Sequence, residues 1–301
     1  MRYSSFLTDN GRWDGFAFRP GDIIISTPAK CGTTWTQMIC ALLIFQTPEP
    51  PQALDLLSPW LEMRLRRKAE VFALYEAQTG RRFIKSHTPF DGLPSDDRVT
   101  YVSVGRDPRD VAVSWNHHME NLDLPAIFST LAAAIEPGDN FAPPPVRPEF
   151  ADEREAILYW IDDPTPPEEV AMSLAGTIHH LQTFWAVRDR DDVVLLHYDD
   201  LQADLEGEMR RLADRLGIKV PDDRWPALVQ AASFAEMRSR ADRVAPDTAN
   251  RIWKDTAGFF HRGRSGQWRD TLQESDLAHY RARVRELAPP DLVAWLHHEN
   301  L

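Results

Sequence analysis

One short segment near the N-terminus limits the possible folds more than any other part of the sequence. Residues 22–26 ("DIIIS") form an apolar run typical of a β-strand, residues 27–32 ("TPAKCG") have the composition of a turn, and residues 33–45 form a long apolar stretch without glycine or proline. A strand, a glycine-containing turn and a helix follow one another in α/β folds. Such a turn favours anion binding, because free N–H groups and the helix dipole point into it.

The rest of the chain repeats the same alternation of elements. We expect three more strands at 81–86, 99–104 and 193–197, and helices at 61–76, 108–119, 171–188 and 199–217. The strands lack a clean polar alternation, which is typical of a parallel sheet covered on both faces. The sequence therefore predicts an α/β fold, with a central parallel sheet flanked by helices on both faces. At 301 residues we expect a single domain spanning 1–301.

Two segments interrupt this pattern. Residues 136–168 hold many of the prolines and several acids without periodicity, and a segment this long is typically a lid, a binding loop or a disordered loop. Residues 245–270 form a second irregular stretch, rich in arginine, glycine and aromatic residues. We interpret residues of about 120–168 as a lid or loop insertion that binds a substrate.

Charge and composition exclude several classes of partner. The formal net charge of -12 argues against nucleic acid and anionic membranes as partners, so any anion site must be a local cluster of basic residues. The sequence has no apolar run of the roughly 20 residues that a membrane span needs. Its N-terminus is polar where a signal peptide needs an apolar core, and we expect a cytoplasmic protein. If Cys31 and Cys40 lay on one helix they would be roughly 13 Å apart, too far for a disulfide, so both should be free thiols.

The turn has the residues of a phosphate-binding loop in an unusual order. Lys30 comes before Gly32, and Thr33 and Thr34 follow, whereas a nucleotide triphosphatase loop places its lysine after the glycine. The strand ending near residue 104 leads into Arg106 instead of a metal-binding aspartate, which disfavours metal-dependent phosphoryl transfer. A phosphatase cysteine loop is excluded because Gln37 stands where its arginine belongs. Anion binding without a metal is the better interpretation.

Four separated segments together resemble one known family, the cytosolic sulfotransferases that depend on 3′-phosphoadenosine 5′-phosphosulfate (PAPS). In chain order they are "TPAKCGTTW" (27–35), "FIKSHTPF" (83–90), "RDPRDVAVSW" (106–115) and "FFHRGRSGQW" (259–268). The resemblance implies sulfonate transfer from PAPS to an acceptor hydroxyl or amine, with PAP as the product and no metal. It also implies an α/β fold whose central parallel sheet, flanked by helices on both faces, forms a P-loop-like nucleotide-binding core.

Transfer of a sulfonate needs a deprotonated acceptor and positive charge on the oxygen that leaves with the nucleotide. His87 is the natural general base, because imidazole titrates near neutral pH. A lone histidine is more often structural, but Lys85 projects from the same side of the strand and a donor loop precedes both. We expect Lys30 and Lys85 to stabilise the leaving oxygen.

The resemblance also assigns residues to the nucleotide. The loop residues Lys30, Cys31, Gly32, Thr33 and Thr34 would hold the 5′-phosphosulfate, with Cys31 acting only as a small spacer. The 3′-phosphate would be bound by Arg106, Ser114, Arg262 and Gly263. The adenine would contact Trp35, Phe234 and Tyr198. The chain departs from the family at His261, where an arginine is common, so one phosphate contact is expected to be lost or made sensitive to pH.

Two rival functions remain at this point: a P-loop nucleotide kinase, and a non-catalytic PAP-binding protein. His87 argues against the second. The acceptor is expected to be a small phenolic or glycolipid-like molecule, because Phe128, Phe141 and Phe150 in the insertion suit an apolar or amphipathic compound. A homodimer is possible. Three pairs of adjacent histidines, 117–118, 179–180 and 297–298, suggest zinc, but neighbours on a helix point about 100° apart and we predict no metal site.

Overall fold

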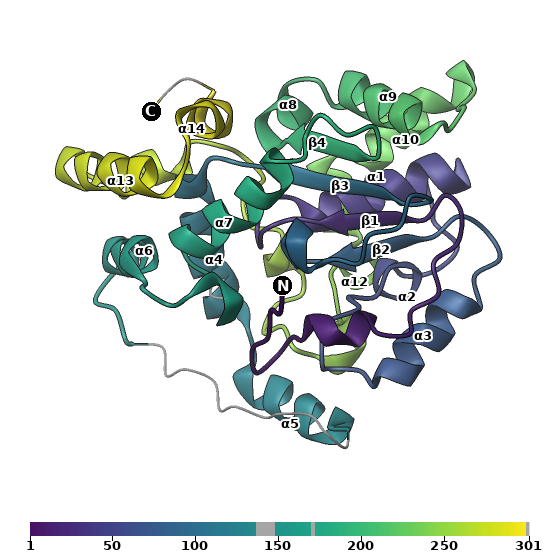
Figure 1. The fold of residues 1–301 in the computed structure, drawn as a ribbon, viewed down its shortest axis with the longest axis horizontal. Helices are drawn as coiled ribbons and strands as arrows, with labels where there is room; N and C mark the ends of the chain where they lie inside the picture. The colour runs from purple at the N-terminus through teal and green to yellow at the C-terminus, as the bar shows by residue number, and fades with distance from the viewer. Residues whose placement is uncertain (137–147, 170–171, 299–300) are drawn as a thin grey trace.

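A four-stranded parallel sheet forms the centre of the computed structural model, which describes residues 1–136, 148–169, 172–298 and 301. The strands are β1 (Ile23–Ser26), β2 (Phe83–Ser86), β3 (Thr100–Gly105) and β4 (Val193–His197). They lie in the order β2-β1-β3-β4, and every neighbouring pair is parallel (Figure 1). The predicted α/β fold and the positions of all four predicted strands are confirmed.

Both faces of the sheet are covered by helices, as the continuous apolar strands indicated. Ile23 and Ile25 pack on one face against α1 (Thr33–Phe45), α9 (Leu205–Leu216) and α10 (Trp225–Ala231). Ile24 points to the opposite face, where it packs with residues of α3 (Lys68–Glu76) and α7 (Leu174–Trp185). Figure 1 shows these two helical layers on either side of the strands.

A third apolar cluster holds the helix that follows β3. This helix, α4 (Pro108–Asn121), packs together with α6 (Glu153–Asp162), α7, α13 (Glu274–Leu287) and α14 (Pro290–His297). Asp107 caps α4 by accepting the N–H of Arg109 at 2.9 Å, and Pro108 occupies the first turn. The cluster thereby fixes the position of α4 beside the carboxyl ends of the strands.

The structure differs from the sequence prediction at two helices. The helix predicted for 61–76 begins only at Lys68, because the side chains before it bond to the N-terminal segment: Arg64 Nη2 lies 3.0 Å from Asp9 Oδ2. The helix predicted for 199–217 is divided into α8 (Tyr198–Ala203) and α9. Asp204 separates them, since its side chain accepts the N–H of Gly207 at 2.9 Å and starts a new helix.

The irregular segments contain more helix than expected. Residues 120–136 include α5 (Leu124–Ala134), and α6 lies within the stretch predicted as a loop at 136–168. Residues 245–270 have only short 3-10 turns, as expected. The remaining short elements are η1 (Asn10–Trp13), α2 (Leu54–Leu57), η2 (Phe90–Gly92), η3 (Pro167–Glu169), η4 (Asp222–Arg224), α11 (Phe234–Ser239), α12 (Ala241–Val244), η5 (Thr248–Asn250), η6 (Ala257–Phe259) and η7 (Gln267–Asp270).

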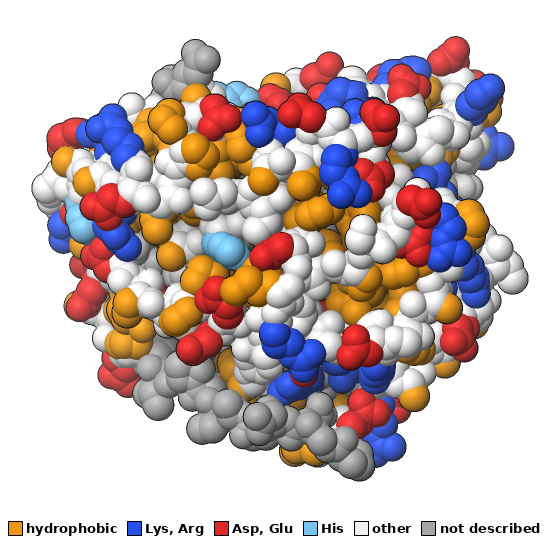
Figure 2. All heavy atoms as spheres, in the orientation of Figure 1, with side chains coloured by type: hydrophobic (Ala, Val, Ile, Leu, Met, Phe, Trp, Pro, Cys, Tyr) orange, Lys and Arg blue, Asp and Glu red, His pale blue; other side chains and the backbone are white. Residues whose placement is uncertain are grey.

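Acidic and basic side chains are mixed over the face of the molecule that Figure 2 shows. The basic side chains predicted to bind an anion do not all belong to this surface: Lys85 and Arg106 are buried, with 6% and 4% of their surface exposed. No helix among the described residues is long and apolar enough to span a bilayer.

Candidate active site

The turn between β1 and α1 has an unusual backbone conformation. Lys30 has φ 65° and Gly32 has φ 107°, both in the left-handed region. Such a φ is uncommon for a lysine, and strain of this kind is concentrated at functional sites. A Cβ on Gly32 would also lie 3.2 Å from the ring of Tyr198, the residue after β4, so glycine allows the loop to approach this ring closely. The loop therefore presents its backbone at the start of α1.

Three basic side chains meet near this loop. Arg106, at the end of β3, donates from Nη1 to the Lys30 carbonyl oxygen at 2.9 Å and lies with its guanidinium carbon 4.0 Å from the centre of the Tyr198 ring. Burial, followed by the charges of Arg106 and Lys85, lowers the pKa of Lys30 to about 7. Burial also lowers the pKa of Lys85. A positive cluster thus exists within a chain of net charge -12.

Arg106 is not paired with its acidic neighbours. Asp107 instead binds Arg109, whose Nε and Nη2 donate to the carboxylate at 2.9 and 2.6 Å, and Arg109 also stacks on Trp268 at 4.0 Å. The Nε atom of Arg106 is buried without a hydrogen-bond partner among the described residues. The structure therefore leaves Arg106 available for an anionic ligand, and gives Arg109 a structural position.

The C-terminal loop is tied to α4 by a carboxylate that the sequence did not reveal as part of the site. Asp110 accepts the N–H groups of Gly266 and Gln267 at 2.7 and 2.8 Å, and burial raises its pKa. Arg264 in the same loop accepts a hydrogen bond from Arg106 Nη2 at 3.4 Å through its carbonyl oxygen. The loop and the strand end are therefore joined by direct contacts.

The aromatic residues predicted to bind adenine lie at two loops, the one before α1 and the C-terminal one. Trp35 meets Tyr198 edge-on with ring centres 5.3 Å apart, and its indole N–H donates to the carbonyl oxygen of Ala232 at 2.9 Å. Phe234 lies against Gly263, whose φ is 59°; a Cβ there would be 2.2 Å from the Phe234 ring. Trp35 and Phe234 are both half-buried, so each keeps part of its ring accessible.

His87 lies directly after β2 and has a defined tautomer. Its Nδ1 is 2.7 Å from the Thr27 carbonyl oxygen. Because a carbonyl oxygen can only accept, Nδ1 carries the proton and Nε2 is the basic nitrogen. Burial, followed by Lys85 and Lys30, lowers the pKa of His87 to about 3. The imidazole is therefore neutral at physiological pH.

Trp60 is a site residue that sequence analysis missed. Its ring lies 4.4 Å from the ring of His87 and 5.0 Å from Lys85 Nζ, so one indole contacts both side chains. It belongs to a stretch adjoining the predicted helix at 61–76, and no local signal distinguishes it.

His118 was also missed: it was set aside as one of a histidine pair, yet its Nδ1 is 3.4 Å from Lys30 Nζ. Burial and then Lys30 hold the pKa of His118 well below its usual value.

A hollow opens beside His87, and its wall mixes polar side chains with apolar ones such as Trp60, Pro89 and Met172. The lining residues come from the N-terminal segment, from the stretch before α3, and from α7, and include Tyr3, Thr8, Asn10, Glu62, Thr177 and His180. Phe128 packs near Phe6 and Phe150 near Tyr159, and neither is among the described residues that line the hollow. Phe141 lies outside the described residues.

Glu62 organises this wall and has no counterpart in the sequence prediction. Its Oε1 accepts hydrogen bonds from Trp13 Nε1 at 2.6 Å and from the hydroxyl groups of Ser86 at 2.5 Å and Thr88 at 2.8 Å. Burial raises its pKa. Three donors thus hold one carboxylate in place between the N-terminal segment and the His87 loop.

The other predicted residues are placed as follows. Thr33 shares a hydrogen bond of 2.6 Å with Thr27, and Thr34 is half-buried at the start of α1. Cys31 is fully buried in the α4 cluster, and burial raises its pKa to about 12, which suits a spacer. Ser114 is half-buried on α4. Arg262 is partly exposed, 3.7 Å from Asp270. Cys31 and Cys40 are free thiols, as expected.

The adjacent histidines do not act as pairs. The two members of each pair have different partners. His117 contacts Glu153 and His118 contacts Lys30; His179 contacts Tyr3 and His180 contacts Ser26. His297 contacts Tyr280 and His298 contacts His197. Neighbouring helical residues point apart, as the helix geometry requires.

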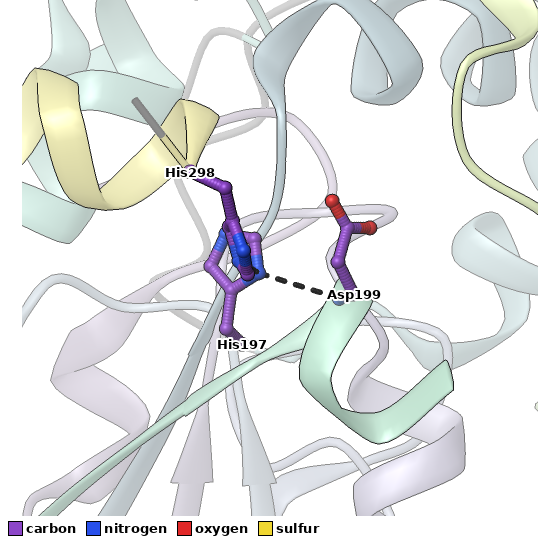
Figure 3. A group of neighbouring side chains, drawn as sticks. All are labelled: His197, Asp199 and His298. Carbon is purple, nitrogen blue, oxygen red and sulfur yellow. Dashed lines mark hydrogen bonds between the residues drawn. The ribbon is translucent and has the colours of Figure 1, made fainter. Parts of the chain in front are cut away.

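One group could still suggest a metal site, formed by His197, Asp199 and His298 (Figure 3). Potential ligand atoms of these three lie within 4.8 Å of one another. However, His298 Nε2 is 2.6 Å from His197 Nδ1. Two nitrogens bound to one tetrahedral zinc at about 2.0–2.1 Å would be about 3.3 Å apart. The contact is therefore an N–H···N hydrogen bond between the rings.

Comparison with known proteins identifies the family. Residues 20–289 match the profile described as "Sulfotransferase domain". The chain belongs to the sulfotransferase family. This result confirms the resemblance carried by the four sequence segments and favours the sulfotransferase prediction over a nucleotide kinase.

Individual relatives support the same assignment. A protein named glycolipid sulfotransferase from Mycobacterium bovis is 44% identical, over 98% of this chain and 93% of its own length. A protein of the same name from Mycobacterium tuberculosis is 43% identical over the same shares. Among solved structures, retinol dehydratase in complex with androsterone and the inactive cofactor PAP has a TM-score of 0.68 at 20% identity, covering 94% of this chain and 89% of that one. At this identity it supports the fold.

Proposed function

We propose that this sulfotransferase moves the sulfonate of PAPS to a hydroxyl group of a glycolipid-like acceptor. The two mycobacterial relatives, at 44% and 43% identity, are named for glycolipids, which supports an acceptor of this class. The solved retinol dehydratase that shares the fold is complexed with PAP, which supports PAPS as the donor. We also propose a cytoplasmic protein, in keeping with its free thiols.

The donor is held at the carboxyl ends of β1, β3 and β4. Lys30 and the backbone at Gly32–Thr34 bind the 5′-phosphosulfate, while Arg106, Ser114, Arg262 and the Gly263 backbone bind the 3′-phosphate. Trp35, Tyr198 and Phe234 contact the adenine. The support for this arrangement is geometric: Arg106 bonds to the Lys30 carbonyl oxygen at 2.9 Å and contacts Tyr198, and Gly263 lies against Phe234.

His87 acts as the general base. Its Nε2 takes the proton of the acceptor hydroxyl while the acceptor oxygen forms a bond to sulfur, and the bond from sulfur to the phosphate oxygen breaks. Lys30 and Lys85 stabilise the negative charge that develops on that phosphate oxygen. The arriving anionic donor offsets the charges of the two lysines, which together with burial lower the His87 pKa, and so makes the base stronger when the site is filled.

The wall beside His87 suits a sugar. Thr8, Glu62 and Thr177 supply hydroxyl and carboxylate groups. A carbohydrate presents several hydroxyl groups that such groups can bind, whereas an apolar wall would leave them without partners. The same wall also has apolar side chains, including Trp60, Pro89 and Met172. A wall that mixes the two kinds supports an amphipathic acceptor whose reacting hydroxyl is on a sugar headgroup.

A single observation carries the proposal. His87 lines the hollow, its Nδ1 donates to the Thr27 carbonyl oxygen so that Nε2 is the basic nitrogen, and Lys85 and Lys30 are near enough to lower its pKa. The first experiment measures thermal stabilisation by PAP and, separately, by ATP with magnesium. Stabilisation by PAP alone is expected. Stabilisation by ATP with magnesium and not by PAP would support a kinase instead.

The second experiment follows transfer of labelled sulfonate from PAPS to glycolipids, phenols, sterols and amines, with EDTA present. We expect transfer to a glycolipid, and we expect EDTA to have no effect because every charge in the proposed mechanism comes from side chains. Binding of PAP without transfer to any acceptor would instead support a non-catalytic nucleotide-binding protein.

A further inference from the structure

Two histidines from distant parts of the chain form a stacked pair at the donor site. The rings of His117 and His261 have centres 3.6 Å apart and planes inclined by 23°. His117 lies on α4, three residues after Ser114, and His261 immediately precedes Arg262. Both neighbours are residues that the proposed function assigns to the 3′-phosphate. The pair therefore lies where an anionic group of the donor would be bound.

The two rings have unequal polar partners. His117 Nε2 lies 3.1 Å from Glu153 Oε1, and its Nδ1 lies 3.7 Å from Glu120 Oε2. His261 Nε2 is buried and has no hydrogen-bond partner among the residues that the structure describes. A buried polar atom without a partner is unfavourable, and this one points to a group that a ligand can complete.

The charges around His261 come from several segments and are mostly positive. Besides His117, the groups are Arg262 in the same loop, Lys30 in the loop before α1 and Arg238 on α11. Burial, His117 and then these three basic side chains lower the pKa of His261 to about 4. Without an anion present, the ring is neutral at pH 7. The acids lie elsewhere: Glu153 and Glu120 face His117, and Asp270 lies 3.7 Å from Arg262.

We propose that His261, supported by the stacked His117, binds the 3′-phosphate of the nucleotide and takes up a proton as it does so. This inference rests on the proposed function. A phosphate dianion replaces the repulsion among the basic groups by attraction, and a protonated imidazole then donates from Nε2 to a phosphate oxygen. His117 lies between His261 and Glu153, so the carboxylate helps to accommodate the positive charge on the stacked pair.

The direction of the pH effect follows from linkage. The His261 pKa is low in the free protein and higher in the complex, so binding consumes a proton between those two values. The affinity for PAP therefore increases as pH falls through the pKa of the complex, by up to about tenfold for each pH unit. The second ionisation of the phosphate itself, near pH 6, also contributes, but it is common to all variants.

The test is calorimetric titration of PAP into the wild-type protein and into His261→Arg, at pH 6 to 8 in buffers of different ionisation enthalpy. The wild type should take up more protons than His261→Arg, by up to one per PAP at the lower pH values. The arginine is already charged, so at pH 8 this variant should bind PAP at least about tenfold more tightly. His279→Gln is the matched control, because His279 is an exposed histidine 2.8 Å from Asp162 and should leave proton uptake unchanged.

Two further measurements make the outcome unambiguous. His261→Gln removes the titrating group without adding charge, and it should lose the proton uptake while binding PAP more weakly; it serves if the arginine variant fails to fold. Adenosine 5′-monophosphate lacks the 3′-phosphate, and with this ligand wild type and variants should take up equal numbers of protons. The inference is wrong if the wild type binds PAP but His261→Arg and His261→Gln take up as many protons as the wild type. It is also wrong if the difference in proton uptake persists with adenosine 5′-monophosphate. If the wild type fails to bind PAP, the proposed function itself is wrong.

Discussion

Gly263 is the position at which one added methyl group tests the donor site most directly. Its φ of 59° lies in the left-handed region, and a Cβ would be placed 2.2 Å from the Phe234 ring. A carbon–carbon contact is normally no shorter than about 3.5 Å, so in Gly263→Ala the ring must move by about 1 Å or more. If Phe234 stacks on the adenine, the variant loses much of that contact.

The size of the effect can be estimated by comparison with a second glycine. Gly217, at the end of α9, has φ 66°, and a Cβ there would meet nothing within 4 Å. Gly217→Ala therefore has only the backbone cost of the left-handed conformation, roughly 1–2 kcal/mol. Gly263→Ala has the same backbone cost and also displaces Phe234. Stacking of a base on an aromatic ring is worth roughly 1–3 kcal/mol, which corresponds to a rise in the PAP Kd of roughly 5- to 150-fold.

The assay combines thermal unfolding with calorimetric titration of PAP. Both variants should show a lower Tm, by roughly 2–4 °C per kcal/mol, and only Gly263→Ala should show weaker PAP binding. A folded Gly263→Ala protein with the wild-type Kd would refute the assignment of Phe234 to the adenine. Equal weakening in Gly217→Ala would show that backbone strain, and not the ring, controls the affinity.

Three other substitutions test separate parts of the structure. His87→Ala should lower kcat about 10²–10⁴-fold while the PAP Kd stays the same, measured by sulfonate transfer and calorimetry; near-normal turnover would reject His87 as the base. Arg106→Ala should weaken PAP binding by about 1.5–3 kcal/mol, because a charged contact to phosphate is lost, and an unchanged Kd would remove it from the donor site. Asp22→Asn should lower the free energy of unfolding in urea by about 3–5 kcal/mol, because it leaves the buried Arg82 without its partner, whose Oδ1 is 2.9 Å from Nε; a loss below 1 kcal/mol would contradict this.

The fold could be predicted, and the candidate donor residues could be identified, because their signals are local. The four apolar runs identified the strands, and a candidate site residue lies just beyond each of them. Lys30 lies four residues beyond β1, and His87, Arg106 and Tyr198 directly follow β2, β3 and β4. Parallel strands bring their carboxyl ends to one edge of the sheet. The topology of the sheet alone thereby gathers four residues, which span 169 residues of sequence from Lys30 to Tyr198, at its carboxyl edge.

The acceptor side could not be predicted because its contacts are long-range. Trp60 and Glu62 lie in and beside a stretch whose composition favours a helix, but side-chain bonds to Trp13, Ser86 and Thr88 hold that stretch in an irregular conformation. No pattern in the sequence reports such partners. The stacking of His117 on His261 likewise depends on where the C-terminal loop crosses α4. The pairing of adjacent histidines, which the sequence does display, proved uninformative.

Much of the proposed acceptor wall comes from stretches of the chain that the nucleotide would not contact. The hollow beside His87 takes its wall partly from residues 3–10 and 60–62, and Thr8 forms a bridge with Met63 that holds these stretches together. Of the proposed phosphate-binding loops, the loop before α1 reaches the hollow through Pro28 and Ala29, and no residue of 259–268 is among the described residues that line it. Exchanging the two short stretches between related chains should therefore transfer acceptor preference while the nucleotide machinery stays intact, so that new sulfated products could be obtained by recombination of natural sequences.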